Sequence, residues 1–178
     1  MTKSDQDNIT RINEEESMQL LGYSGYFGRF KFRLRFLRSW LLHSIAYSSP
    51  HPGIAISMQR ARGVKIGRNC HIGPYVIIDL IHPDMVKIGD NVTIGLKTMI
   101  FAHSVASTNP FLKSRGYVRK IDPVIIKSGA IIYPGCIIKS GVTVGENSMI
   151  SIGSVVAESI PDNCIAVGNP ARVVKRIE

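Results

Sequence analysis

A large aliphatic residue recurs at every sixth position over most of the chain. A period of six fits neither the 3.6-residue period of an α-helix nor the alternation of an isolated strand. Side chains spaced in this way can all point inward and stack on their copies one coil away, which predicts a parallel β-helix with three hexads per coil. The residues that open the hexads are Ile66, Ile72, Ile78, Ile88, Ile94, Ile100, Ile126, Ile132, Ile138, Val144, Ile150 and Val156.

The positions between these aliphatic residues carry turn signals. Four residues after most of these aliphatic residues the side chain is small or modest in size, as at Cys70, Ser104 and Cys136, and we expect these side chains to point inward. Gly or Asn stands one position earlier at most corners, and both residues tolerate a positive φ. The corners predicted in this way are Asn69, Asn91, Gly129, Gly135, Gly141, Asn147 and Gly153.

The hexad count predicts about four coils with two interruptions. Both interruptions follow a third hexad, so both leave the β-helix at the same corner, and the longer one exceeds ordinary connection lengths. Long loops on a rigid scaffold often carry function. The coils are 66–83, 88–105, 126–143 and 144–161, and the insertions are 84–87 and the protruding loop 106–125.

The N-terminal third follows a different pattern. Apolar residues between Phe27 and Ile45 fall on one helical stripe, whereas the stretch FKFRLRF alternates as a strand does. We favour a helix within 17–48 because the stripe persists longer, and Pro50 and Pro52 mark its end. Residues 1–12 are polar enough for disorder. The chain therefore divides into a disordered and helical segment, 1–62, and a β-helix domain with a C-terminal tail, 63–178.

Composition narrows the function classes. The formal net charge of +9 is gathered in patches at 29–38, 113–120 and the last seven residues, and it suits a polyanionic small molecule or a membrane surface. No motif supports nucleic-acid binding. Three cysteines without a CxxC pair fit a reducing compartment, and we expect a cytoplasmic protein. The basic helical stripe within 26–47 packs on the β-helix or a partner subunit, or else contacts a membrane peripherally.

The hexads from Ile66 to Ile160 and the tail AVGNPARVVKRI resemble the hexapeptide-repeat acyltransferases. The stretches DLIHPDMVKIGDNVTIG, MIFAHS and IPDNCIAVGNPARVVKRI are most similar to sugar O-acetyltransferases of the maltose and galactoside type. The resemblance implies a left-handed β-helix, a homotrimer, acetyl-CoA in the groove between neighbouring subunits, and a histidine beside the long loop as general base.

His103 is the candidate base, because it directly precedes the long loop and matches the family's histidine segment. An imidazole can take the proton of an acceptor hydroxyl as the oxygen attacks the thioester. The alternative is a solvated turn residue. Relatives often carry Glu directly after this histidine, whereas Ser104 stands there, so the group that orients the imidazole is undefined. Ser104, Asp79 and His82 are candidate acceptor contacts. The alternative for Asp79 is a solvated corner residue, and the alternative for His82 is packing at an irregular corner.

Cofactor-binding residues follow from the same resemblance. Arg172 and Lys175 match basic residues near the CoA phosphates, or they form a solvated tail. Pro134, Ile152 and Ala157 match positions that line the pantetheine groove. No metal is required.

The sequence thus predicts an acetyl-CoA-dependent O-acetyltransferase that acts on a sugar or polysaccharide hydroxyl by direct transfer in a ternary complex. One alternative is an N-acetyltransferase on an amino sugar or another small amine. A γ-type carbonic anhydrase, which needs three imidazoles on a metal, is a second alternative, although His71, His82 and His103 lack its close histidine pair. A non-catalytic scaffold is the third.

Overall fold

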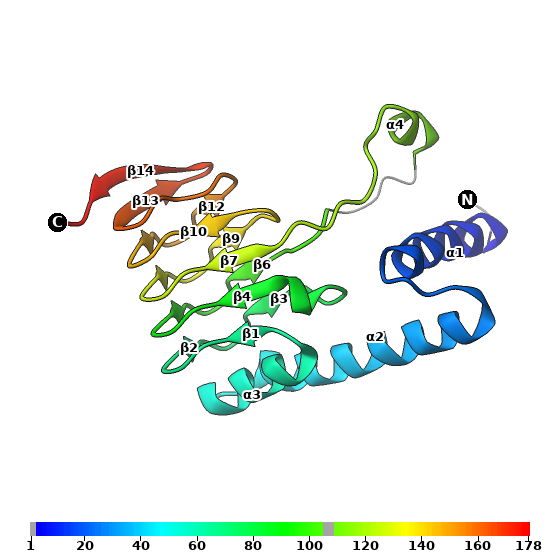
Figure 1. Cartoon of the computed structure of the whole chain (residues 1–178), viewed down its shortest axis with the longest axis horizontal. Coiled ribbons are helices and arrows are strands. Elements are labelled where there is room, and N and C mark those ends of the chain that lie inside the picture. Colours follow the sequence, from blue (N-terminus) through cyan, green and yellow to red (C-terminus); the bar gives the residue numbers. More distant parts are fainter. Residues whose placement is uncertain (1–2, 105–108) are drawn as a thin grey trace. The chain divides into compact units, whose positions relative to one another are not determined.

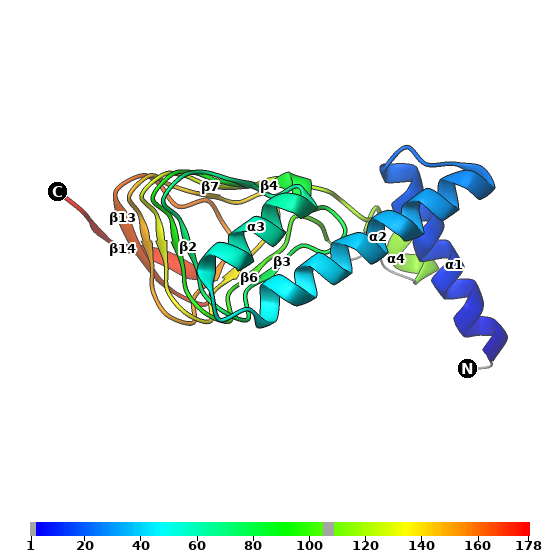
Figure 2. The ribbon, with the colours of Figure 1, turned by 90° about the horizontal axis from the view of Figure 1, so that it is seen from below.

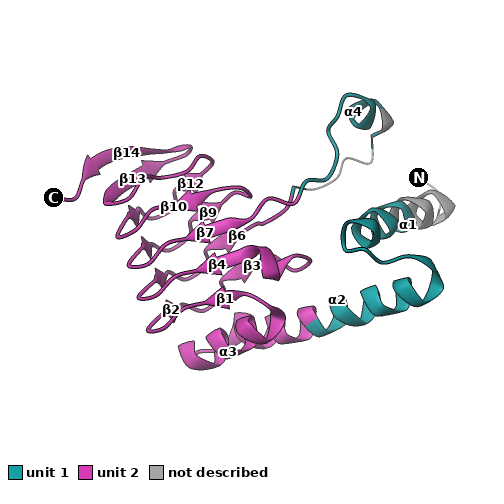
Figure 3. Ribbon diagram, viewed as in Figure 1, with its two compact units in different colours: residues 1–38, 104–120 teal, residues 39–103, 121–178 magenta. Residues whose placement is uncertain are grey.

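A computed structural model describes residues 3–104 and 109–178 of the chain. The described residues group into two compact units (Figure 3). The first unit draws on 1–38 and 104–120, and the second on 39–103 and 121–178. The second unit contains the coiled β-structure that the hexads predict.

Short strands in the second unit form three sheets that run along a stack of coils (Figure 1). Sheet A contains β1 (Lys65–Ile66), β4 (Val86–Ile88), β7 (Val124–Ile126) and β10 (Thr143–Val144). Sheet B contains β2 (His71–Ile72), β5 (Thr93–Ile94), β8 (Ile131–Ile132) and β11 (Met149–Ile150). Sheet C contains β3 (Ile77–Ile78), β6 (Met99–Ile100), β9 (Ile137–Ile138) and β12 (Val155–Val156). All of these strands pair in parallel with their copies one coil away, which confirms the predicted parallel β-helix.

The predicted aliphatic positions form the core. Each residue that opens a hexad is buried except Ile66 in the first coil, which is partly buried against the core. Copies lie directly opposite each other, as Ile78 does to Ile100. Burial of a large aliphatic side chain contributes about 1.5–3 kcal/mol, so the stacked column is the main source of stability.

The predicted corners also form. All seven Asn and Gly corner positions have a positive φ, for example 58° at Asn91 and 73° at Gly129. Cys136 is buried as expected, Cys70 is partly buried, and Ser104 is exposed. The inward placement of Ser104 was therefore wrong, because the chain leaves the coil at this point and enters the long insertion.

Two elements that the hexad pattern does not predict cover the ends of the stack of coils (Figures 1 and 2). Helix α3 (Pro52–Arg62) packs against β1 and β2 of the first coil. His51 caps its start, where Nδ1 accepts the N–H of Gly53 at 3.2 Å. At the other end, β13 (Cys164–Gly168) extends sheet B and pairs antiparallel with β14 (Ala171–Arg176).

The two insertions carry short helices. A 3₁₀ helix, η1 (Pro83–Met85), fills the first insertion between β3 and β4. The second insertion contains α4 (Pro110–Ser114), and residues 105–108 of the predicted loop lie outside the described part of the chain.

The first unit contains α1 (Lys3–Leu20), α4 and the first part of α2 (Gly25–Ser48). FKFRLRF lies inside α2, so helix was the correct choice over strand. Residues 3–12 are helical, contrary to the expected disorder. Arg33 Nε donates to Glu14 Oε1 at 2.7 Å, and Arg29 Nη2 donates to Glu15 Oε1 at 2.9 Å, which ties α1 to α2. Among the described residues, no helix is both long and apolar enough to span a membrane.

Candidate active site

Asp79 and His103 lie side by side at the corner that follows sheet C. Asp79 comes directly after β3, and His103 comes shortly after β6, the neighbouring strand. The parallel register places Ile78 opposite Ile100, so the segments that leave these strands stack on each other. As a result, Asp79 Oδ2 lies 2.5 Å from His103 Nδ1.

The Asp79 carboxylate is buried and fully engaged. Oδ1 accepts the backbone N–H groups of Ile81 at 3.0 Å and His82 at 2.9 Å, and Oδ2 accepts that of Ala102 at 2.8 Å. Burial would raise the pKa of this carboxyl group, but the hydrogen bonds from His103, His82 and Ala102 outweigh it and lower the pKa to about 2. Asp79 is therefore ionised at neutral pH.

This geometry corrects the expectations for Asp79. Its side chain is 0% exposed, so it is not a solvated corner residue, and its carboxylate is not open to an acceptor. Instead it supplies the group that orients His103, which the sequence left undefined.

His103 is held between this carboxylate and solvent. A carboxylate at Nδ1 keeps the proton on that nitrogen and leaves Nε2 as the proton acceptor. The side chain is 13% exposed. Its backbone forms an antiparallel bridge with Ile121, and Asp122 N–H donates to Ala102 O at 3.0 Å. These contacts join the two ends of the long insertion, and His103 lies in the coil immediately before it.

The other two candidate acceptor contacts, His82 and Ser104, lie in different environments. The His82 side chain is buried, and its ring stands edge-on to that of His103 with 5.5 Å between the ring centroids. This agrees with packing at an irregular corner. Ser104 is exposed, and its hydroxyl accepts the backbone N–H of Lys120 at 3.0 Å within the first unit.

The predicted pantetheine-groove residues divide between two corners of the coil. Pro134 and Ile152 lie at the corner between sheets B and C, and Ile152 is 70% exposed. Ala157 directly follows β12, so it lies at the corner between sheets C and A, which also carries His103 two coils away. These residues therefore border opposite edges of sheet C.

The two predicted phosphate contacts lie on β14. Arg172 and Lys175 are exposed. The Arg172 guanidinium forms an ion pair with Glu158, in which Nη1 lies 3.3 Å from Oε2. Lys175 lies opposite Ile165 of β13.

The remaining histidines bear on the alternative of a metal site. Among residues 3–104 and 109–178, no group of three His, Cys, Asp or Glu side chains is placed to hold a metal ion. His71 is exposed on β2, a strand of sheet B, whereas His82 and His103 lie at the corner after sheet C.

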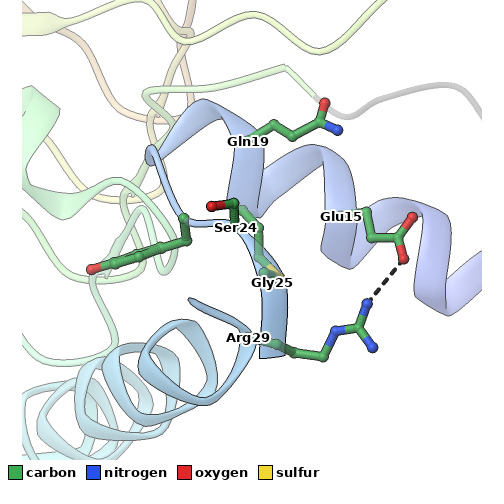
Figure 4. Close-up of a pocket in the computed structure, with 7 residues that line it drawn as sticks. Glu15, Gln19, Ser24, Gly25 and Arg29 are labelled. Atoms are coloured by element: carbon green, nitrogen blue, oxygen red, sulfur yellow. Dashed lines mark hydrogen bonds and ion pairs between the residues drawn. The ribbon is translucent and has the colours of Figure 1, made fainter. Parts of the chain in front are cut away.

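A pocket lies at the turn between α1 and α2 in the first unit (Figure 4). The Glu15–Arg29 ion pair belongs to it, and the sequence-predicted site residues do not. Its lining residues are Glu15, Met18, Gln19, Tyr23, Ser24, Gly25 and Arg29.

The hexad spacing contained a sign of the Asp79–His103 contact, which we did not use in the sequence analysis. Asp79 follows Ile78 and the segment with His103 follows Ile100, and these two aliphatic residues are equivalent positions in successive coils. An acid and a base that leave the same corner one coil apart are expected to meet. What the hexads could not supply was the inward turn of the Asp79 side chain.

Comparison with known proteins identifies the family of the chain. No family model matches the chain. WcaF of Escherichia coli (strain K12), a candidate colanic acid biosynthesis acetyltransferase, is 33% identical over 134 residues, which cover 67% of this chain and 73% of WcaF. Galactoside O-acetyltransferase of the same strain is 36% identical over 117 residues, which cover 62% of this chain and 56% of the enzyme. The chain thus spans little more than half the length of this second relative.

A solved structure shares the fold. It is a hexapeptide-repeat containing acetyltransferase from Vibrio cholerae O1 biovar eltor, complexed with acetyl coenzyme A. The two structures superpose with a TM-score of 0.68 at 21% identity, and the match covers 82% of this chain and 88% of the other. The identity to WcaF over most of its length, together with the coil of hexads, shows that the chain belongs to the hexapeptide-repeat acetyltransferase family and is similar to its galactoside-type O-acetyltransferases.

Proposed function

We propose that the chain transfers an acetyl group from acetyl-CoA to a hydroxyl of a sugar or polysaccharide, with His103 as the general base. The observation that carries this proposal is the 2.5 Å contact between Asp79 Oδ2 and His103 Nδ1. A buried carboxylate at one imidazole nitrogen makes the other nitrogen a proton acceptor in a fixed direction. The sugar-modifying relatives support the acceptor class.

The reaction needs no covalent enzyme intermediate. His103 Nε2 accepts the proton of the acceptor hydroxyl while its oxygen attacks the thioester carbonyl carbon. The new C–O bond forms, the C–S bond breaks, and the proton on His103 passes to the CoA thiolate, which leaves as the free thiol. Asp79 acts as a positioning residue that stabilises the imidazolium formed between these steps.

The pantetheine arm of CoA is proposed to lie against Pro134, Ile152 and Ala157. These residues border opposite edges of sheet C, so a second chain beside that sheet would complete a groove. Exposed apolar residues at the corner between sheets B and C favour such packing, and the proposed assembly is a homotrimer. They are Tyr75, Leu96, Tyr133 and Ile152.

Complementation tests this assembly. Light scattering after size exclusion should give three times the chain mass. Mixed trimers of His103→Asn and Ile152→Arg chains should recover part of the wild-type rate if a groove uses residues of two chains. Full activity from an isolated monomer would contradict the shared groove.

A peripheral membrane contact through 26–47 is proposed for α2. Phe27, Phe30, Leu34, Leu41 and Ile45 are at least 49% exposed and recur at helical spacing on one face. No Asp or Glu occurs between Glu16 and Asp79, so the flanking charges on this helix are all cationic. Such a face suits an anionic lipid surface.

Vesicle sedimentation tests this contact. The full chain should pellet with vesicles of phosphatidylglycerol and phosphatidylcholine but not with phosphatidylcholine alone. The Leu41→Ser/Ile45→Ser variant should pellet less. Binding to neither vesicle would contradict the proposal and favour packing of α2 on a partner chain.

Two measurements test the activity itself. Titration calorimetry should detect acetyl-CoA binding, and a screen of sugar acceptors should give a mass gain of one acetyl group. Hydroxylamine should remove that group if it is an ester, whereas an amide would survive and indicate an N-acetyltransferase. Absence of acetyl-CoA binding would instead support a scaffold.

A matched pair of variants tests the base. His103→Asn should lower kcat by about 100-fold or more, because general-base catalysis contributes about 10²–10⁴. His71→Asn, at an exposed histidine on β2, should leave kcat unchanged. Equal rates for wild type and His103→Asn would show that His103 is not the base.

A further inference from the structure

Arg62 is a buried cation at the end of α3 whose guanidinium reaches the segment that carries Asp79. The residue is 8% exposed. Nη2 donates to Asp79 O at 2.6 Å, and Nη1 and Nη2 both lie 3.2 Å from Ile78 O. Arg62 Nε also donates to Ser39 Oγ at 3.1 Å, and that hydroxyl donates to Leu80 O at 2.8 Å. Three consecutive carbonyl groups, 78–80, are thus held from α2 and α3.

Among the described strands of sheet C, none lies beyond β3 to donate hydrogen bonds to these carbonyl groups. β3 is the edge strand of sheet C, and the N–H groups of Ile77 and Asp79 already point to the second coil, where they bond Thr98 O and Ile100 O at 2.9 Å. Successive residues of a strand direct their backbone groups to alternate sides, so Ile78 O, between these two residues, faces the open end of the coil. Asp79 O lies beyond the end of β3 and meets the same guanidinium. Buried carbonyls need a donor there, and Arg62 provides one directly behind Asp79.

Uncharged polar side chains contact the Arg62 guanidinium. Nη1 donates to Gln59 Oε1 at 2.5 Å and lies 3.1 Å from His43 Nδ1. Burial, with a smaller effect of the Arg62 charge, lowers the pKa of His43 to about 4, so this histidine is neutral and accepts. Burial also lowers the pKa of Arg62 to about 10, and the Asp79 carboxylate partly opposes this, so Arg62 remains charged at neutral pH.

We propose that Arg62 is a positioning residue for the Asp79–His103 pair. Its planar guanidinium fixes the backbone of 78–79, and this sets the direction in which the Asp79 carboxylate meets His103. The inference rests on the proposed function, in which that direction decides which imidazole nitrogen accepts a proton.

The competing role is merely to seal the open end of the coil, and Arg60 offers a matched control for it. Arg60 lies on the same helix and also caps first-coil carbonyls, because its guanidinium donates to Ile66 O at 3.0 Å and Gly67 O at 2.5 Å. It does so after β1, at a different corner from Asp79. A sealing role would affect both arginines alike, whereas positioning concerns Arg62 alone.

Steady-state kinetics with acetyl-CoA and an acceptor from the screen provide the first test. Arg62→Gln should lower kcat by about 10- to 100-fold, as loss of a supporting hydrogen-bond partner commonly does, with the KM for acetyl-CoA changed less than about twofold. Arg62→Lys keeps the charge but loses the planar fork, so it should restore only part of kcat. Arg60→Gln should keep the wild-type kcat. If Arg62→Gln does not fold, Ser39→Ala, which releases Leu80 O, should lower kcat in the same direction.

A second readout separates this inference from the proposed function. Nitrogen-15 spectra of the imidazoles report which nitrogen of His103 carries the proton, whether or not the protein is active. The wild type should show a proton on Nδ1, and Arg62→Gln should show a mixture, whereas Arg60→Gln should match the wild type. An inactive wild type with this pattern would refute the function and leave the positioning role standing. An unchanged His103 spectrum and kcat in folded Arg62→Gln would overturn the positioning role.

Discussion

Asp79 Oδ2 meets His103 Nδ1 at 2.5 Å although the two residues belong to different coils of the β-helix. The contact exists because parallel register stacks β3 on β6, and because three backbone N–H groups hold the carboxylate in one orientation. A histidine fixed in this way has one nitrogen committed to the protein and one available to a substrate.

Asp79→Asn should therefore impair catalysis far more than binding. The amide is nearly isosteric but neutral, so it neither fixes the Nδ1 proton nor stabilises an imidazolium, and kcat should fall by about 100-fold or more. The KM for acetyl-CoA should stay within about threefold. Asp162→Asn is the control, because Asp162 pairs with Lys127 on the surface at 2.9 Å. A normal kcat for Asp79→Asn would contradict the positioning role of Asp79.

Stability should fall as the pH falls, in two steps. The folded pKa of His43 is about 4, below the ordinary 6.5, so between these values the unfolded chain binds a proton that the folded chain does not. The pKa of Asp79 is about 2 against an ordinary 3.8, which gives the same sign at lower pH. Each group contributes on the order of 2–3 kcal/mol, fully present above its unfolded pKa and lost as the pH falls through its folded pKa.

Urea unfolding at pH 7, 5.5 and 4 measures the first step. The free energy of unfolding should decrease across this range in the wild type and in His71→Asn, since His71 is exposed. The decrease should be smaller in His43→Gln. A wild-type free energy that does not change between pH 7 and 4 would show that His43 titrates normally.

The tail should contribute to CoA affinity through charge. Arg172→Ala and Lys175→Ala should each weaken CoA binding by about 3- to 10-fold at low salt, and the effect should shrink at high salt because exposed charges are screened. Calorimetry with CoA and with a CoA analogue lacking the ribose phosphate identifies the group recognised. Glu158→Gln frees Arg172 from its ion pair and should not weaken binding. Salt-independent affinity in all variants would rule out a phosphate contact by the tail.

Two isoleucines should separate stability from binding. Ile132 is 0% exposed in the core, so Ile132→Ala should cost about 2–5 kcal/mol of unfolding free energy. Ile152 is 70% exposed on the single chain, so Ile152→Ala should destabilise the fold of the chain much less than Ile132→Ala does, but it should weaken acetyl-CoA binding if it lines the groove. Thermal unfolding and calorimetry of both variants provide the comparison. Normal acetyl-CoA affinity in Ile152→Ala would remove this residue from the proposed groove.

The hexad pattern alone was sufficient to predict the parallel coil, its corners and the positions of its insertions. The pattern is local and periodic, so the identity of each residue indicates its position in the coil. Ile78 indicates an inward strand position in this way, and Asn91 indicates a corner. The resemblance in the same stretches pointed to His103. Helix α3 and the β13–β14 hairpin were missed because they lie outside the repeat and only cover its ends.

The tertiary structure alone decided how the candidate site is built. Whether Asp79 faces solvent or His103, and whether Arg62 is an ordinary helix cation or the donor behind Asp79, depends on atoms brought together from α3 and two coils. Such contacts do not follow the six-residue period of the sequence. They depend on the direction of each side chain at a corner and on backbone carbonyls at the edge strand of a sheet that no other strand bonds. The repeat determines where each coil lies, and the packing of its ends and corners determines which groups can act on one another.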